Sequence, residues 1–315
     1  MARKKATISR ARGHSRKAIA VGKAMAETAL KRRESDARVR RRALASNSTA
    51  VTRTIETTGR RGVQPIRITR ASAGVLVAEG DSWFDYPFYD VLGDLENLGY
   101  DIESVAHRGD TVEGMAYTDQ LDDFSRAIEK ALSGGLPLKA ILLSGGGNDI
   151  AGDHFEMLLN HAASANPGLN AEVVAGVMQR IHDSYVTILQ AITTLCQKRV
   201  GRAVPILVHG YDYSVPDGRG YLGGWWLLPG PWLKPGFDQK GYDKDAGRRM
   251  VKQLIDGFND MLRGIAGHAP FAHVRHVDLR RTLSTGTDYK TWWGNELHPT
   301  KRGFSAVTDK FVAAL

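Results

Sequence analysis

The sequence predicts a doubly wound, mostly parallel five-stranded α/β sheet with helices on both faces, preceded by a basic N-terminal extension. Short apolar runs rich in Val, Ile and Leu, typical of strands buried on both faces, recur along the chain. They alternate with segments whose apolar residues repeat at i, i+3 and i+4, the period of an amphipathic helix. This repeated strand-then-helix order favours parallel strands joined by crossover helices. The 315 residues, 42% of them hydrophobic, are enough for one such domain and an appendage.

The individual elements follow from these patterns. Five strands are expected, at Val75–Ala78, Ile102–Ala106, Ala140–Ser144, Val204–His209 and His273–Leu279. Five helices are expected between or after them, at Val91–Leu98, Leu121–Leu132, Val173–Leu195, Met250–Ile265 and Phe304–Leu315. In a sheet of this class ligands bind at the carboxyl ends of the strands, so the turns that follow the strands are expected to carry the functional residues.

The basic charge is concentrated in the N-terminal extension, residues 1–71. This segment holds 20 of the 43 Lys and Arg residues but only 4 of the 34 Asp and Glu residues. Because it has few large apolar residues, it cannot bury enough surface to fold alone, and we expect it to be disordered or helical. The Ser/Thr-rich stretch after Ala45 is interpreted as a linker to the folded domain, residues 72–315.

Composition also excludes several classes of protein. Cys196 is the single cysteine, which rules out an intrachain disulfide and a cysteine-based metal cluster. The N-terminus lacks the apolar core of a secretory signal, and the most apolar segment, Tyr221–Phe237, is interrupted by Gly and Pro. We therefore expect a soluble, cytoplasmic protein, and the residues imply neither a cofactor nor a metal.

A serine follows the first predicted strand directly, in the sequence Gly80-Asp81-Ser82-Trp83. A tight strand-to-helix turn of this kind can present a hydroxyl group to a cleft. By itself the tripeptide is common, and the simpler interpretation is that Asp81 or Ser82 caps the next helix.

The next two strands are followed by turns that contain glycine. Gly109 lies in the turn after the second strand, where its backbone N–H could face the same cleft. After the third strand comes Gly145-Gly146-Gly147-Asn148-Asp149, in which the glycines would let the backbone approach a ligand closely and Asn148 offers an amide. A phosphate-binding loop is the rival interpretation, but the Lys and Ser/Thr of a P-loop are missing.

The last of these turns contains a histidine. His298-Pro299 follows the last strand and precedes the final helix, for which Thr300 is the expected N-cap. Taken together, Gly-Asp-Ser, Gly, Gly-x-Asn-Asp and His-Pro, each after a successive strand, resemble the motifs of the SGNH/GDSL serine hydrolase family. The resemblance covers residues 74–315, and its four motif residues are Ser82, Gly109, Asn148 and His298.

The resemblance implies an esterase-type hydrolase, such as a carboxylesterase, lipase-like enzyme or deacetylase, with a small-molecule ester as substrate. Ser82 would be the nucleophile and His298 its base. The backbone N–H groups of Ser82 and Gly109 and the side-chain amide of Asn148 would form the oxyanion hole. An acyltransferase that uses the same Ser-His pair is a close alternative.

The sequence departs from the family at the third triad position. Family members usually carry an Asp three residues before the histidine, where this chain has Asn295. An amide oxygen can accept the Nδ1–H of His298 and orient the ring, although it adds no full negative charge. Asp288, Glu296 or a backbone carbonyl are the alternatives for this orienting role.

A loop rich in tryptophan, Tyr221–Trp232, follows the fourth strand at the same rim. It either packs on its own domain or forms a lid or acyl pocket, in which case Trp225 and Trp226 would contact the substrate.

A different class of function follows from the extension. Its charge would give non-specific binding to nucleic acid or another polyanion, or to an anionic surface, with the hydrolase-like domain serving as a scaffold. The extension contains no Trp, Phe or Tyr on which bases could stack. The residues do not indicate an oligomeric state.

Overall fold

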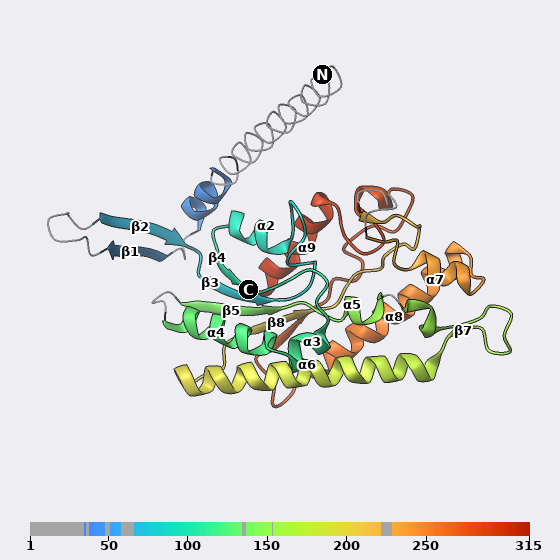
Figure 1. Cartoon of the computed structure of the whole chain (residues 1–315). Helices are drawn as coiled ribbons and strands as arrows, with labels where there is room; N and C mark the ends of the chain where they lie inside the picture. The colour runs from blue at the N-terminus through green and yellow to red at the C-terminus, as the bar shows by residue number, and fades with distance from the viewer. Residues whose placement is uncertain are drawn as a thin grey trace, which may run out of the picture.

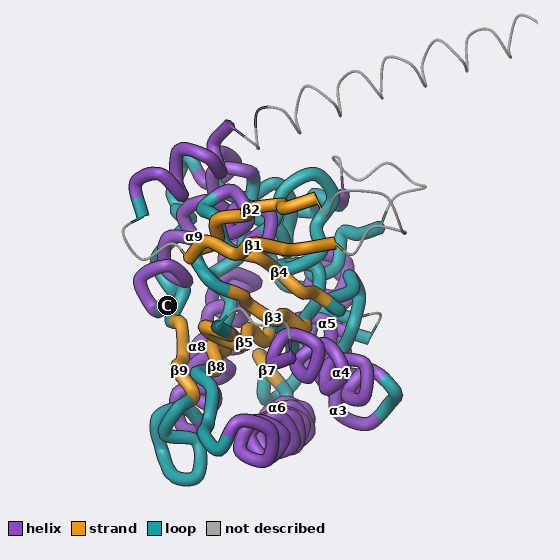
Figure 2. The backbone as a smooth tube through the Cα atoms, turned by 90° about the vertical axis from the view of Figure 1, so that its left-hand side faces the viewer, coloured by secondary structure: helices purple, strands orange, loops and turns teal. Residues whose placement is uncertain are grey.

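The centre of the molecule is a sheet of five parallel strands. The computed structural model describes residues 35, 38–47, 51–57, 66–133, 137–152, 154–221 and 229–315. The strands are β3 (Val75–Glu79), β4 (Asp101–Ser104), β5 (Leu138–Leu143), β8 (Ile206–His209) and β9 (Val274–Val277). They are ordered β4-β3-β5-β8-β9, and every neighbouring pair is parallel (Figure 2). All five expected strands are confirmed, with ends shifted by a few residues.

Helices cover both faces of this sheet, as predicted (Figure 1). On one face α2 (Val91–Asn97) packs against α9 (Lys301–Ala314). On the other, α6 (Ala171–Val200) packs against α4 (Gln120–Ser133) and α8 (Lys244–Ile265). Shorter elements were not expected: α3 (Val112–Tyr117), α5 (Gly147–Ile150), α7 (Lys234–Gln239), the 3-10 turns η1 (Phe155–Leu158) and η3 (Tyr289–Thr291), and the antiparallel pair β6 (Leu159–Asn160) and β7 (Gly168–Leu169).

The long helices begin and end at residues suited to those positions. Asn170 caps α6 by accepting a hydrogen bond from the Val173 N–H, and Gly201 ends the helix with a left-handed φ of 71°. Thr300 caps α9 by accepting from the Gly303 N–H, which confirms the predicted cap. Since α9 begins directly after His298-Pro299, this cap fixes where the histidine loop ends.

The buried side chains form two apolar clusters. The larger surrounds the sheet and includes Leu76, Val77 and Leu142, none of which is exposed. The smaller is built by α8, α7 and η1 and includes Phe155, Leu233, Phe237, Met250, Val251 and Leu254. This second cluster lies beyond the carboxyl end of the sheet and supplies apolar walls beside the candidate site.

The segment after Ala45 differs from the predicted linker. Strands β1 (Val51–Thr57) and β2 (Ile66–Ser72) form an antiparallel pair. Their sequences, VTRTIET and IRITRAS, are rich in the β-branched residues that favour strands, a signal that the high Ser/Thr content obscured. Before them, the helical segment 38–46 is held to the domain by Arg40, which donates hydrogen bonds to the carbonyls of Glu96 and Tyr100.

Candidate active site

Ser82 lies in the turn that follows β3. The Asp81 carboxylate accepts a hydrogen bond from the Trp83 N–H at 3.0 Å, and the Phe84 N–H donates to the Asp81 carbonyl at 3.0 Å. Gly80 lets the turn approach β5, because a Cβ at this position would lie 2.7 Å from the Ser144 Cβ. No helix begins here; the next one, α2, is capped by Asp90. The simpler interpretation of this motif as a helix cap is therefore wrong.

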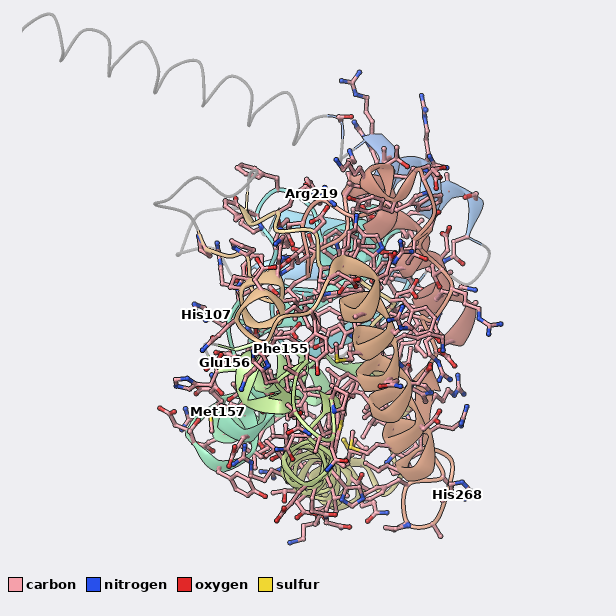
Figure 3. All side chains as sticks on the ribbon, turned by 90° about the vertical axis from the view of Figure 1, so that its right-hand side faces the viewer. His107, Phe155, Glu156, Met157, Arg219 and His268 are labelled. Atoms are coloured by element: carbon pink, nitrogen blue, oxygen red, sulfur yellow. The ribbon has the colours of Figure 1, made fainter. Side chains whose placement is uncertain are left out.

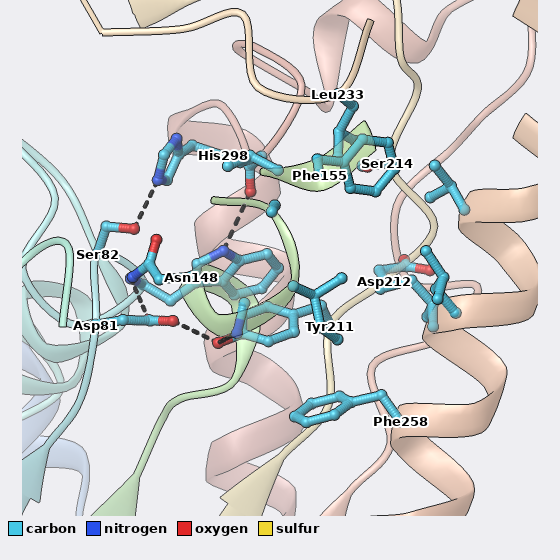
Figure 4. Close-up of a pocket in the computed structure, with 18 of the residues that line it drawn as sticks. Asp81, Ser82, Asn148, Phe155, Tyr211, Asp212, Ser214, Leu233, Phe258 and His298 are labelled. Carbon is cyan, nitrogen blue, oxygen red and sulfur yellow. Dashed lines mark hydrogen bonds between the residues drawn. The ribbon is translucent and has the colours of Figure 1, made fainter. Parts of the chain in front are cut away.

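The hydroxyl of Ser82 points at His298 (Figure 4). Ser82 Oγ lies 2.7 Å from His298 Nε2, across 216 residues of sequence. On the other side of the ring, His298 Nδ1 lies 3.0 Å from Asn295 Oδ1. The two turns are tied together by Trp83, whose indole N–H donates to the Leu297 carbonyl at 3.1 Å.

The hydrogen bonds of Asn295 determine the tautomer of His298. Asn295 Oδ1 accepts from the backbone N–H groups of Leu297 at 2.9 Å and His298 at 2.8 Å, which identifies this atom as the oxygen. This oxygen can only accept a hydrogen bond from His298 Nδ1 as well, so Nδ1 carries the ring proton. This leaves Nε2 as an acceptor for the Ser82 hydroxyl proton, the arrangement that a general base requires.

Two aromatic rings enclose the imidazole. Tyr86 stacks on His298 with ring centroids 4.4 Å apart, and Trp232 meets it edge-on at 5.6 Å. The Tyr86 hydroxyl also accepts from the Asn295 amide at 3.1 Å, so one residue supports both His298 and its partner. Burial lowers the pKa of His298 to about 3, because the enclosed ring cannot be hydrated when charged. Sequence reasoning missed Tyr86, since no motif distinguishes it from the neighbouring aromatic residues.

Asn148 and the Gly109 turn are also brought to the Ser82 side of the site. The Asn148 amide donates to the Asp110 carbonyl at 2.9 Å, and the His107 N–H donates to the Gly80 carbonyl at 2.9 Å. These bonds hold the turns after β3, β4 and β5 against one another. Asn148 and Ser82 line the same cavity, and Gly109 has a left-handed φ of 91°, which favours glycine.

The glycines before Asn148 allow close packing of side chains, and Gly147 also lines the cavity beside Ser82, where the sequence predicts a close approach of the ligand. A Cβ on Gly146 would lie 2.6 Å from the Phe258 ring, and one on Gly147 would lie 3.0 Å from Tyr211. The Gly147 N–H donates to the Tyr211 hydroxyl at 3.1 Å. The glycines therefore hold the Asn148 turn against two buried aromatic rings.

A buried polar network that sequence reasoning did not identify supports the Ser82 turn. Asp81 accepts from Ser144 Oγ at 2.8 Å and from the Tyr211 hydroxyl. Ser144 Oγ in turn lies 2.7 Å from His209 Nε2. Because Asp81, Ser144 and His209 are almost completely buried, these bonds satisfy groups that would otherwise be costly to bury.

The two acidic alternatives to Asn295 bind elsewhere. The Asp288 carboxylate accepts from Ser284 Oγ at 2.5 Å and from the Trp292 indole at 3.1 Å. The Glu296 carboxylate is buried and accepts from four backbone N–H groups, those of Gly218, Trp232, Leu233 and Lys234. Glu296 thus anchors the segment that carries Trp232 beside His298, and Asn295 alone of the three contacts the imidazole.

The expected substrate contacts Trp225 and Trp226 lie outside the described residues. The base of their loop is described: the Tyr221 N–H donates to the Pro229 carbonyl at 2.9 Å. The Tyr221 ring lies edge-on to Tyr86 at 5.9 Å. The loop therefore starts from the aromatic wall that encloses His298.

Comparison with known proteins gives the fold. No family model matches the chain, and no curated protein matches its sequence. Among solved structures, a lipase from a goat rumen metagenome is 16% identical, with a TM-score of 0.50, over 77% of this chain and 97% of the lipase. The doubly wound α/β fold predicted from the sequence is confirmed, since the lipase shares it. An aryl esterase of M. smegmatis is 15% identical, with a TM-score of 0.43, over 77% of this chain and its own full length.

Within this fold, the four motif residues lie on the turns that follow β3, β4 and β5 and on the loop before α9. The described helices include none long and apolar enough to cross a membrane. Within the same described ranges, no three His, Cys, Asp or Glu side chains are grouped as metal ligands.

Proposed function

We propose that this protein hydrolyses carboxylic esters through an acyl-enzyme on Ser82, with His298 as general base. The observation that carries the proposal is the 2.7 Å contact between Ser82 Oγ and His298 Nε2, with the imidazole oriented by Asn295. A serine hydroxyl is a weak nucleophile unless a base within hydrogen-bonding distance accepts its proton. The burial of His298 keeps Nε2 unprotonated at neutral pH.

The reaction uses each of these atoms in turn. Ser82 Oγ attacks the acyl carbonyl carbon while its proton passes to His298 Nε2, and the carbonyl oxygen becomes an oxyanion. The Asn148 amide and the N–H groups of Ser82 and Gly109 would stabilise that oxyanion. The carbon–oxygen bond to the alcohol then breaks, and His298 returns the proton to the leaving oxygen. Water repeats the sequence on the acyl-enzyme, which releases the acid and regenerates the Ser82 hydroxyl.

Covalent labelling tests the proposal directly. A fluorophosphonate probe reacts with an activated serine, and we expect mass spectrometry to find it on the peptide that contains Ser82. The folded Ser82→Ala variant and heat-denatured protein are the controls and should remain unlabelled. A folded wild-type protein that takes up no probe at Ser82 would contradict the assignment.

The amide at position 295 predicts a change in the pH profile. In Asn295→Asp, the new carboxylate favours the charged imidazolium, so it raises the pKa of His298 from its low, burial-determined value. The base is active when unprotonated, so the acidic limb of the profile of kcat/KM against pH should move to higher pH. At pH 8 activity should hold or rise, because a carboxylate also stabilises the imidazolium of the transition state.

Asp288→Asn is the matched control for that experiment. It removes a carboxylate seven residues away that binds Ser284 and Trp292, so it should leave the acidic limb unchanged. If the limb stays in place in Asn295→Asp and moves in Asp288→Asn, Asn295 does not orient the base.

A further inference from the structure

A cavity opens from the Ser82 and His298 side chains into the second apolar cluster (Figure 4). Its volume is about 70 Å³. The walls away from Ser82 are hydrophobic and include Phe155, Leu233, Val251, Leu254, Ile255 and Phe258. A chain that extends from a carbonyl carbon bound at Ser82 would therefore meet mainly hydrocarbon, with Ser214 as a small polar residue beside Phe155 and Leu233.

The charged and phenolic groups in the same lining are already hydrogen-bonded to the protein. The carboxylate of Asp212 accepts from three backbone N–H groups, those of Tyr213, Arg281 and Leu283. The Asp81 carboxylate accepts hydrogen bonds from the Tyr211 hydroxyl and the Trp83 N–H, and the Tyr211 hydroxyl accepts from the Gly147 N–H. No ionised group in the described lining is thus left to pair with a charged acyl chain, which would lose its hydration on entry.

Two aromatic residues in the cavity wall are tightly packed. Phe258 stacks on Tyr211 with centroids 5.6 Å apart, and its ring lies against Gly146, where even a Cβ would come within 2.6 Å. On the opposite wall, Phe155 is held by an edge-on contact with Phe237 at 5.1 Å. A close-packed interior loses stability when its side chains are forced apart, so these walls should resist a longer ligand.

The volume sets the length of chain that fits. One water-sized position needs about 10–15 Å³ on this measure, so the cavity holds roughly five such positions in all. We infer that the acyl group is a short, uncharged aliphatic chain, from acetyl to about hexanoyl. The inference rests on the proposed ester hydrolysis at Ser82. It states that the acyl group of the ester, and not the alcohol group, enters the cavity.

Esters that differ only in acyl length test the inference on the full chain. For p-nitrophenyl acetate, butyrate, hexanoate, octanoate and laurate, kcat/KM should rise by up to about fourfold per methylene while the chain fits. It should then fall at least tenfold by laurate. A profile that is flat or still rising at laurate overturns the inference, provided that Ser82 takes up the fluorophosphonate probe. If no ester is hydrolysed and Ser82 takes up no probe, the proposed function and this inference both fail.

Two variants should move the length limit in opposite directions. Phe155→Ala removes a wall and should shift the optimum to octanoate or longer, whereas Val251→Phe fills the cavity and should shift it to acetate. Met157→Ala is the matched control, because Met157 belongs to the same 3-10 turn as Phe155 but its side chain points to solvent (Figure 3). Its length profile should equal that of the wild type. If both cavity variants are folded and keep the wild-type optimum, the acyl chain does not occupy this cavity.

Discussion

Replacing Ser82 or His298 by alanine is expected to lower kcat for p-nitrophenyl acetate by about 10⁴-fold or more. Ser82→Ala removes the only atom that forms the covalent bond. His298→Ala removes the acceptor of the Ser82 proton, because His298 Nε2 lies 2.7 Å from Ser82 Oγ in the wild type. Because the two groups act as a unit, the double variant should be little slower than either single variant.

The interpretation of these variants depends on intact folding. Ser82 lies in a turn that is held by Asp81 and Trp83, so its loss should leave the thermal unfolding temperature close to that of the wild type. His298→Ala leaves a space between Tyr86 and Trp232 and should lower that temperature by several degrees. Folded Ser82→Ala protein with full activity would mean that hydrolysis takes place elsewhere.

Asn148→Ala is expected to lower kcat by about 10²–10³-fold with little change in KM. The amide has two N–H donors; one is bound to the Asp110 carbonyl and orients the group, and the other remains for the oxyanion. Stabilisation of an oxyanion acts on the transition state and not on the bound ester, so kcat should carry the loss.

A transition-state analogue separates this role from a structural one. A trifluoromethyl ketone that adds to Ser82 forms an oxyanion, and its affinity should fall in Asn148→Ala in parallel with kcat. A loss of affinity for the unreacted ester of the same size would instead show that Asn148 only shapes the cavity.

The sequence predicted the sheet and the position of the motif residues because both depend on short-range patterns. Strand β5, Leu138–Leu143, is apolar because both its faces are covered, and such a run is recognisable without a structure. The turns after β3, β4 and β5 meet because parallel strands end at the same edge. That rule placed Ser82, Gly109 and Asn148 near one another before any distance was known.

The features that were missed depend on contacts between distant segments. The stacking of Tyr86 on His298 joins residues 212 positions apart, and one tyrosine among several neighbouring aromatic residues carries no signal for it. The cavity beside Ser82 was missed for the same reason, because its walls come from η1, α8 and the segment before α7. The choice between Asn295, Asp288 and Glu296 likewise required the actual hydrogen bonds.

The Glu296 carboxylate, which anchors the loop before α7, should couple the hydrogen exchange of four backbone amides. Four backbone N–H groups, those of Gly218, Trp232, Leu233 and Lys234, donate to the single buried carboxylate of Glu296. Releasing one of them leaves that carboxylate less well satisfied and weakens the hold on the others, so the four amides should open together with one free energy. Their protection factors in native-state exchange should agree within about tenfold and fall together in Glu296→Gln. Since the Trp232 N–H is one of the four donors, the same opening event would also set how often Trp232 moves away from the imidazole.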